Sequence, residues 1–137
     1  MKQKITVKAA ISSVNTVMDF VNEQLESHDC PMKAQMQIDV AIDEIFANIA
    51  NYAYPDGIGE ATITIEFDEE DACVQISFED EGAPFDPLAM EDPDVTLSAE
   101  ERKIGGLGIF IVKKTMNGVE YERKDNKNIL TIHKNLT

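Results

Sequence analysis

The chain has 137 residues, 43% of them hydrophobic and 28% charged, which is the size and composition of a single globular domain over residues 1–137. Its apolar stretches fall far short of the ~20 residues that cross a bilayer, and no signal-peptide core follows Met1, so we expect a cytoplasmic protein without membrane contact. The net charge of −14 excludes nucleic acid as an expected partner, and an anionic ligand would need strong local donors and a divalent cation.

The first part of the chain predicts one strand and two helices. Alternating apolar residues indicate a strand over Lys4–Lys8. Apolar residues at helical spacing indicate a helix over about Ile11–Ser27, which Ser12 or Ser13 would cap, and a second helix over about Lys33–Ala53. We expect the buried stripes to be Ile11, Val14, Val17, Met18, Val21 and Leu25 in the first helix and Ile38, Ala41, Ile42, Ile45, Ile49 and Tyr52 in the second.

Two strands follow, each with one apolar and one polar face. Residues 68–71 form the turn between them. The apolar faces consist of Ala61, Ile63, Ile65 and Phe67 in the first strand and of Val74, Ile76 and Phe78 in the second. A sheet with one polar face is covered by helices on its other face only.

The rest of the chain predicts a long irregular connection, a helix and a hairpin. An irregular connection of this length, over about 86–104, is typical of a functional lid. A third helix over about 109–116 precedes strands around Val119–Arg123 and Ile129–Lys134, which residues 125–128 join. This order predicts an α+β fold, a two-layer sandwich with three helices on one face of a mostly antiparallel or mixed sheet. Cys30 and Cys73 are expected to be free thiols.

Three polar residues of the second helix are candidates for chemistry. Glu44, Asn48 and Asn51 fall within about a 60° sector of the helix, at the rim of its apolar stripe. The amide oxygen of Asn48 is the kind of hard ligand that Mg²⁺ binds. Glu44, one turn earlier, is placed to orient or deprotonate a hydroxyl group or water near a terminal phosphate. The same spacing also fits a solvent-exposed polar face.

A carboxylate turn comes directly after the second of the two middle strands. Asp80 stands there, and the chain turns through Gly82. A carboxylate in this position can accept a hydrogen bond from an exocyclic amine such as the adenine amino group. Gly82 permits a positive φ and a close approach of the backbone to a flat ring. A solvated acidic turn is the alternative, because Asp-x-Gly is a common turn sequence.

The glycines Gly105, Gly106 and Gly108 precede the third helix. Glycines at the start of a helix leave its first N–H groups accessible to phosphate, which the helix dipole also attracts. A P-loop is excluded because no Gly-Lys-Ser/Thr follows, and a dinucleotide fingerprint is excluded because no strand precedes the glycines. A glycine hinge against a packed helix is the alternative.

Together, these segments resemble the motifs of the GHKL (histidine kinase-like) ATPase superfamily. The matching pieces are DEIFANIANYAY at 43–54, DEGAPFDP at 80–87 and GGLGIF at 105–110. The compact length and the FDP after the Asp-x-Gly-x-Pro turn resemble the anti-sigma-factor serine/threonine kinases within it. The resemblance implies the Bergerat-type ATP-binding fold, with ATP and Mg²⁺ as cofactors.

The resemblance also implies a role for each matching residue. It implies Glu44 as general base, Asn48 as the Mg²⁺ ligand, and Asp80 with Gly82 beside it as the reader of adenine. Gly106 and Gly108 would lie at the phosphates, under a lid of about Asp86–Ile104. The further candidate nucleotide contacts are Asn51, Arg102, Lys103, Gly105 and Leu107.

The functional expectation is a kinase of the anti-sigma type that phosphorylates a serine of a partner protein, sequesters a sigma factor, or does both. Members of the resembling group are typically dimers. Two positions depart from their pattern: Tyr52 stands where they commonly carry histidine, and Ile104 where they carry a lid arginine. The alternatives are a nucleotide-gated protein-binding module without kinase activity and a scaffold that binds no nucleotide.

Overall fold

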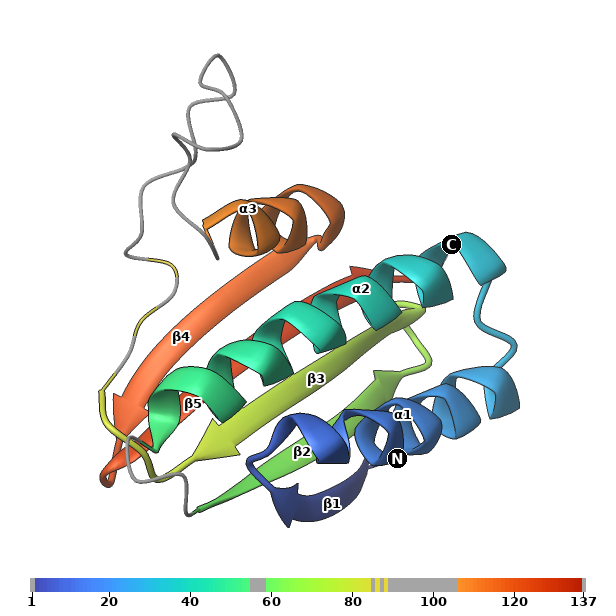
Figure 1. Cartoon of the computed structure of the whole chain (residues 1–137). Coiled ribbons are helices and arrows are strands. Elements are labelled where there is room, and N and C mark those ends of the chain that lie inside the picture. The colour runs from blue at the N-terminus through green and yellow to red at the C-terminus, as the bar shows by residue number, and fades with distance from the viewer. Residues whose placement is uncertain (1, 55–58, 85, 87, 89–105, 137) are drawn as a thin grey trace.

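The fold is a five-stranded antiparallel sheet with helices on one of its faces (Figure 1). The structure is a computed structural model and describes residues 2–54, 59–84, 86, 88 and 106–136. The strands are β1 (Lys2–Lys8), β2 (Glu60–Asp68), β3 (Cys73–Asp80), β4 (Gly118–Lys124) and β5 (Lys127–Asn135), in the spatial order β1-β2-β3-β5-β4. Each neighbouring pair of strands is antiparallel.

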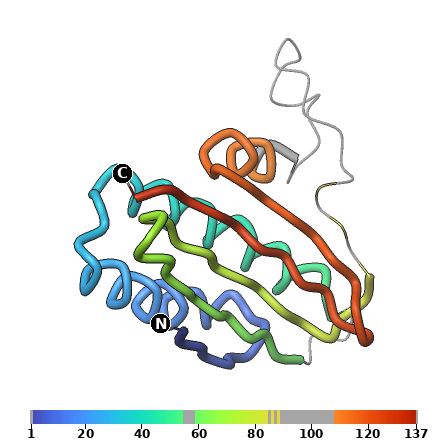
Figure 2. Tube along the Cα trace, turned by 180° about the vertical axis from the view of Figure 1, so that it is seen from behind, coloured from blue at the N-terminus to red at the C-terminus, as the bar shows by residue number. Residues whose placement is uncertain are grey.

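The helices are α1 (Val14–Ser27), α2 (Met32–Asn48) and α3 (Gly106–Thr115). A 3₁₀ turn, η1 (Ile11–Ser13), leads into α1, and a π-helical turn, η2 (Ile49–Ala53), ends α2. Helix α2 lies in front of the strands in Figure 1 and behind them in the view from behind (Figure 2). The predicted α+β sandwich with helices on one face is therefore confirmed. In the described ranges, no helix combines the length and the apolar character that a membrane span needs.

The core lies between the helices and the sheet. The predicted apolar faces of β2 and β3 are buried, and so are most of the predicted helix stripes. Within the sheet, Ile63 pairs with Phe78 and Ile65 with Ile76. A slip of one residue in this register would move every one of these side chains to the polar face. Because burial of each such side chain contributes about 1.5–3 kcal/mol, the core fixes the register.

Two residues predicted to be buried are exposed: Ile11 is 53% and Tyr52 is 49% exposed. Ile11 belongs to η1, outside the phase of the α-helix. Tyr52 lies in η2, where the wider π winding returns the fourth residue after Ile49 to the core instead of the third. That residue is Ala53, which is buried.

The predicted serine cap of the first helix is wrong. Ser13 is the N-cap residue of α1, but its side chain makes no capping hydrogen bond. The physical reason is the 3₁₀ turn, which gives Ser13 helical angles of φ −89° and ψ −7° instead of the extended angles of a capping residue.

The turn between β4 and β5 is tighter than predicted. Asp125 and Asn126 have φ values of 53° and 63°, and two successive positive φ angles characterise a type I′ hairpin turn. Lys127 and Asn128 therefore belong to β5 and not to the connection. The register then pairs Asn128 with Asp80 at the end of β3.

The cysteines are free thiols, as predicted. Burial raises the pKa of both Cys30 and Cys73, so each thiol keeps its proton more strongly than in water.

Candidate functional site

The second half of α2 faces the first turn of α3. Glu44 projects from this side of α2, and a Cβ added to Gly108 would lie 1.8 Å from its Oε2. Only a residue without a side chain therefore leaves room for the Glu44 carboxylate against α3. The structure thus brings together the predicted acid and one of the predicted glycines.

A cavity of about 30 Å³ lies between the end of α2 and the sheet. Its apolar walls are Ile45, Ile49, Ala53, Phe78 and Leu130, and its polar walls are Asn48, Asp80, Tyr121 and Asn128. The predicted amide of α2 and the predicted carboxylate of β3 therefore line the same space. Apolar walls with a few polar groups are the usual make-up of a small-molecule site.

The Asp80 carboxylate is buried, with 4% of the residue exposed. Its Oδ1 accepts hydrogen bonds from the backbone N–H of Gly82 and from Nδ2 of Asn128, both at 2.9 Å. Among the described residues, both hydrogen bonds to this carboxylate end on Oδ1. Oδ2 is therefore the oxygen that is left for a donor on a ligand.

The turn after β3 packs against the end of α2. A Cβ at Gly82 would lie 2.1 Å from the carbonyl oxygen of Ala53, and the N–H of Ala83 donates to that same oxygen at 2.7 Å. Gly82 would permit a positive φ, but its φ lies outside the positive range, and the atoms that a Cβ would meet belong to Ala53. The close approach of the Ala53 backbone therefore accounts for a glycine here, and contact with a flat ring stays a prediction.

Sequence reasoning missed the residues that the final hairpin contributes. Besides its bond to Asp80, Nδ2 of Asn128 donates to the carbonyl oxygen of Ala83 at 2.8 Å, and Oδ1 of Asn128 accepts from the Tyr121 hydroxyl. Nη1 of Arg123 donates to the carbonyl oxygen of Gly82 at 2.8 Å. One signal was present: Asn128 shares the apolar face of β5, where a polar side chain needs buried partners.

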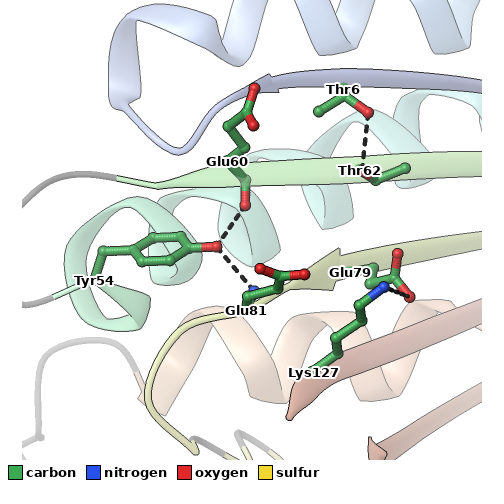
Figure 3. Close-up of polar contacts among 7 residues, drawn as sticks. All are labelled: Thr6, Tyr54, Glu60, Thr62, Glu79, Glu81 and Lys127. Carbon is green, nitrogen blue, oxygen red and sulfur yellow. Dashed lines mark hydrogen bonds and ion pairs between the residues drawn. The ribbon is translucent and has the colours of Figure 1, made fainter. Parts of the chain in front are cut away.

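Tyr54 joins the ends of β2 and β3 on the other side of this turn (Figure 3). Its hydroxyl donates to the carbonyl oxygen of Glu60 at 2.6 Å and accepts from the N–H of Glu81 at 2.8 Å. Burial raises the pKa of Tyr54, so the hydroxyl keeps the proton that it donates. This bridge holds the start of the turn in place.

A larger cavity, of about 750 Å³, lies beside this turn, where its lining includes Thr62 and Glu79 from the polar faces of β2 and β3. Figure 3 shows the hydrogen bond between Thr6 and Thr62 and the pair of Lys127 and Glu79, all of which line it. Asp80 lines both cavities, but Asn48 lines only the smaller one, and Glu44 lines neither. We therefore assign the candidate site to the smaller cavity and the adjoining surface of α2 and α3.

The other predicted site residues fall into two groups. Asn51 is exposed and does not line the smaller cavity, while Gly106 and Leu107 lie in the first turn of α3. Arg102, Lys103, Gly105 and residues 89–104 of the predicted lid lie outside the described residues. The described residues hold no group of three or more His, Cys, Asp or Glu side chains that could bind a metal ion.

The chain matches a known family over most of its length. The profile of the histidine kinase-like ATPase domain covers residues 7–134, which include α2, the turn at Asp80 and α3. The chain belongs to this family. The predicted superfamily is thereby confirmed.

This histidine kinase-like ATPase domain is similar to a curated protein and to a solved structure. The serine/threonine-protein kinase BtrW of Bordetella bronchiseptica is 26% identical over 100 residues, which are 73% of this chain and 70% of that protein. The crystal structure of the RsbU and RsbW domains of Rv1364c from Mycobacterium tuberculosis has a TM-score of 0.72 and 17% identity over 99% of this chain. The alignment takes up 32% of that longer chain and shows a shared fold.

The site of this histidine kinase-like ATPase domain fits ATP in its chemistry. Oδ2 of Asp80 offers an acceptor for an amino group, the apolar walls suit a purine, and Asn48 offers a hard oxygen for Mg²⁺. A cavity of about 30 Å³ holds only one or two water molecules. A purine is larger than this cavity.

Proposed function

We propose that the chain is an ATP- and Mg²⁺-dependent serine/threonine kinase of the anti-sigma type. It would act in the cytoplasm as a homodimer and would phosphorylate a serine of a partner protein, sequester a sigma factor, or do both. The observation that carries the proposal is the shared cavity of Asn48 and buried Asp80, with Glu44 one turn earlier on α2 against Gly108 of α3. The similarity to a protein that is named a serine/threonine-protein kinase supports the same function.

These positions favour one orientation for the nucleotide. The amino group would meet Oδ2 of Asp80 in the cavity, and the phosphates would extend along α2 toward Glu44. One helical turn, about 6 Å, separates Asn48 from Glu44. The phosphates would then reach the first turn of α3, because the first N–H groups of a helix have no partner within the helix and attract anions.

In the proposed transfer, Glu44 acts on the serine hydroxyl of the partner. The serine oxygen bonds to the γ-phosphorus, the bond from phosphorus to the bridging oxygen breaks, ADP leaves, and Glu44 accepts the hydroxyl proton. Asn48 would hold Mg²⁺, which neutralises phosphate charge when bound. That neutralisation matters because the net charge of −14 opposes a triphosphate.

Two measurements on the wild-type chain test the proposal. The first is equilibrium binding of ATP with and without Mg²⁺, and the second is transfer of labelled γ-phosphate to a serine of a protein that co-purifies with the chain. No binding of ATP would overturn the nucleotide function altogether. Binding without transfer to any partner serine would instead support the nucleotide-gated binding module.

Replacing Asn48 with alanine tests the proposed Mg²⁺ ligand. The substitution removes the amide oxygen but leaves Asp80 and the apolar walls, so we expect binding without Mg²⁺ to change little. The gain in affinity on adding Mg²⁺ should fall about tenfold, because one coordinating oxygen is lost. Mg²⁺ titrations at fixed ATP measure this gain. An unchanged gain would remove Asn48 from the metal site, and Asn15→Ala, at an exposed position of α1, is the matched control.

Replacing Gly108 with alanine separates folding from function. The atoms that the new Cβ would meet are the carboxylate end of Glu44, which can rotate away, and alanine favours a helix over glycine by about 1 kcal/mol. We expect the melting temperature to hold or rise while phosphate transfer drops about tenfold or more, because Glu44 is displaced. Thermal unfolding and transfer assays on one preparation measure both effects.

The control is Gly118→Ala, whose Cβ would lie 3.2 Å from Cδ2 of His133, away from the site. Full transfer activity in Gly108→Ala would show that the contact between Glu44 and α3 has no role in the reaction.

A further inference from the structure

We infer that Asn128 is a positioning residue of the nucleotide site, which holds the Asp80 carboxylate so that Oδ2 faces the ligand. The inference rests on the proposed function, because it concerns how the site would recognise an amino group. It gives the β4–β5 hairpin a role in the site, although none of the site residues predicted from the sequence belongs to this hairpin.

The Asp80 carboxylate cannot set its own orientation. The terminal torsion of an aspartate side chain is broad, so hydrogen bonds must choose which oxygen points where. Asn128 supplies one such bond, at 2.9 Å, from a residue that is only 6% exposed. The backbone N–H of Gly82 supplies the other, to the same Oδ1. These two donors together leave Oδ2 turned away from them.

The Asn128 amide is itself held on both of its ends. An amide nitrogen has two N–H donors, and here one meets Oδ1 of Asp80 and the other the carbonyl oxygen of Ala83 at 2.8 Å. The carbonyl end accepts from the Tyr121 hydroxyl. A flipped amide would set its oxygen against two acceptors, Asp80 and Ala83, so the three contacts specify one orientation.

Strand pairing places Asn128 beside Asp80. Asn128 stands opposite Asp80 in the β3–β5 register, and the type I′ turn at Asp125 and Asn126 directly precedes β5. Arg123 of β4 adds a hydrogen bond from the same hairpin to the carbonyl oxygen of Gly82. The hairpin thus contacts Asp80, Gly82 and Ala83 of the carboxylate turn through Asn128 and Arg123.

The decisive experiment is Asn128→Asp, studied against pH. The new carboxyl group would lie beside Oδ1 of Asp80, where two close carboxylates share one proton at lower pH. The shared proton replaces the lost N–H donor, whereas at higher pH both groups are charged and repel each other. We expect the ATP dissociation constant of the variant, divided by that of the wild type at the same pH, to rise about tenfold or more between pH 5.5 and 8.5. The division cancels the titration of ATP itself.

A double-mutant cycle with Asp80→Asn separates positioning from general packing. If Asn128 acts through Asp80, Asn128→Ala should weaken ATP binding about tenfold in the wild type but less than about twofold in the Asp80→Asn background. Tyr121→Phe, which deletes one hydroxyl and keeps the ring, should weaken binding about threefold. Ser77→Ala, which deletes a hydroxyl that bonds Thr131 outside the site, is its control.

The outcomes distinguish a failure of the proposed ATP-dependent function from a failure of the positioning role of Asn128. A wild-type chain that binds no ATP overturns the proposed function and this inference with it. A wild-type chain that binds ATP, together with a flat pH ratio for Asn128→Asp or equal losses in both backgrounds of the cycle, overturns the inference alone.

Discussion

Asp80→Asn is expected to weaken ATP binding about 100-fold while the fold stays intact. The two donors at Oδ1, Gly82 N–H and Asn128 Nδ2, will hold the new amide by its oxygen. The amide nitrogen then replaces Oδ2 and presents N–H groups to the amino group of adenine. A charge-assisted hydrogen bond is thereby exchanged for two donors that face each other, which is why the expected loss exceeds that of an ordinary hydrogen bond.

The measurement is calorimetric titration with ATP, accompanied by thermal unfolding to show that the variant is folded. Glu81→Gln is the matched control, because it removes one negative charge from the adjacent, exposed residue of the same turn. Affinity within about threefold of wild type in Asp80→Asn would show that this carboxylate does not read the base.

Glu44→Gln is expected to lower phosphate transfer about 1,000-fold and to leave ATP affinity within about threefold. Glutamine keeps the shape that fits against Gly108, so the contact between α2 and α3 is preserved. It lacks a basic oxygen that could take the serine proton. The loss should therefore fall on the chemical step and not on binding.

Single-turnover transfer of labelled phosphate, with ATP binding measured in parallel, tests this expectation. Asp43→Asn is the control, since Asp43 is the neighbouring acid but is exposed. Transfer at the wild-type rate in Glu44→Gln would exclude Glu44 as the base. A loss of ATP binding in this variant would instead give Glu44 a role in holding the nucleotide.

The layers of the fold could be predicted from the sequence because burial is periodic. Ile63, Ile65 and their neighbours alternate along β2, and Ile38, Ile42 and Ile45 recur at helical spacing along α2, so each element shows which face meets the core. The element ends could not be predicted in this way. The π winding of η2 and the type I′ turn at Asp125 and Asn126 are choices of local hydrogen bonding that leave the apolar pattern unchanged.

The candidate site shows the same difference between residues that could be predicted from the sequence and residues that could not. Glu44, Asn48 and Asp80 could be singled out because each belongs to a short motif that is complete within a few residues. Asn128 could not, because its meaning depends on lying opposite Asp80, and that neighbour comes from pairing strands far apart in the chain. The reason for a glycine at position 82 was hidden likewise, since the obstacle is the carbonyl of Ala53 at the end of α2.

The π winding of η2 makes the length of this junction critical. Deleting a single residue within Ile49–Ala53 would shift everything that follows by one residue relative to α2. The Ala53 carbonyl would then swing away from Ala83, and the Tyr54 hydroxyl would leave both strand ends that it bridges. Homologous chains should accordingly tolerate exchanges of side chains here far better than gaps or insertions.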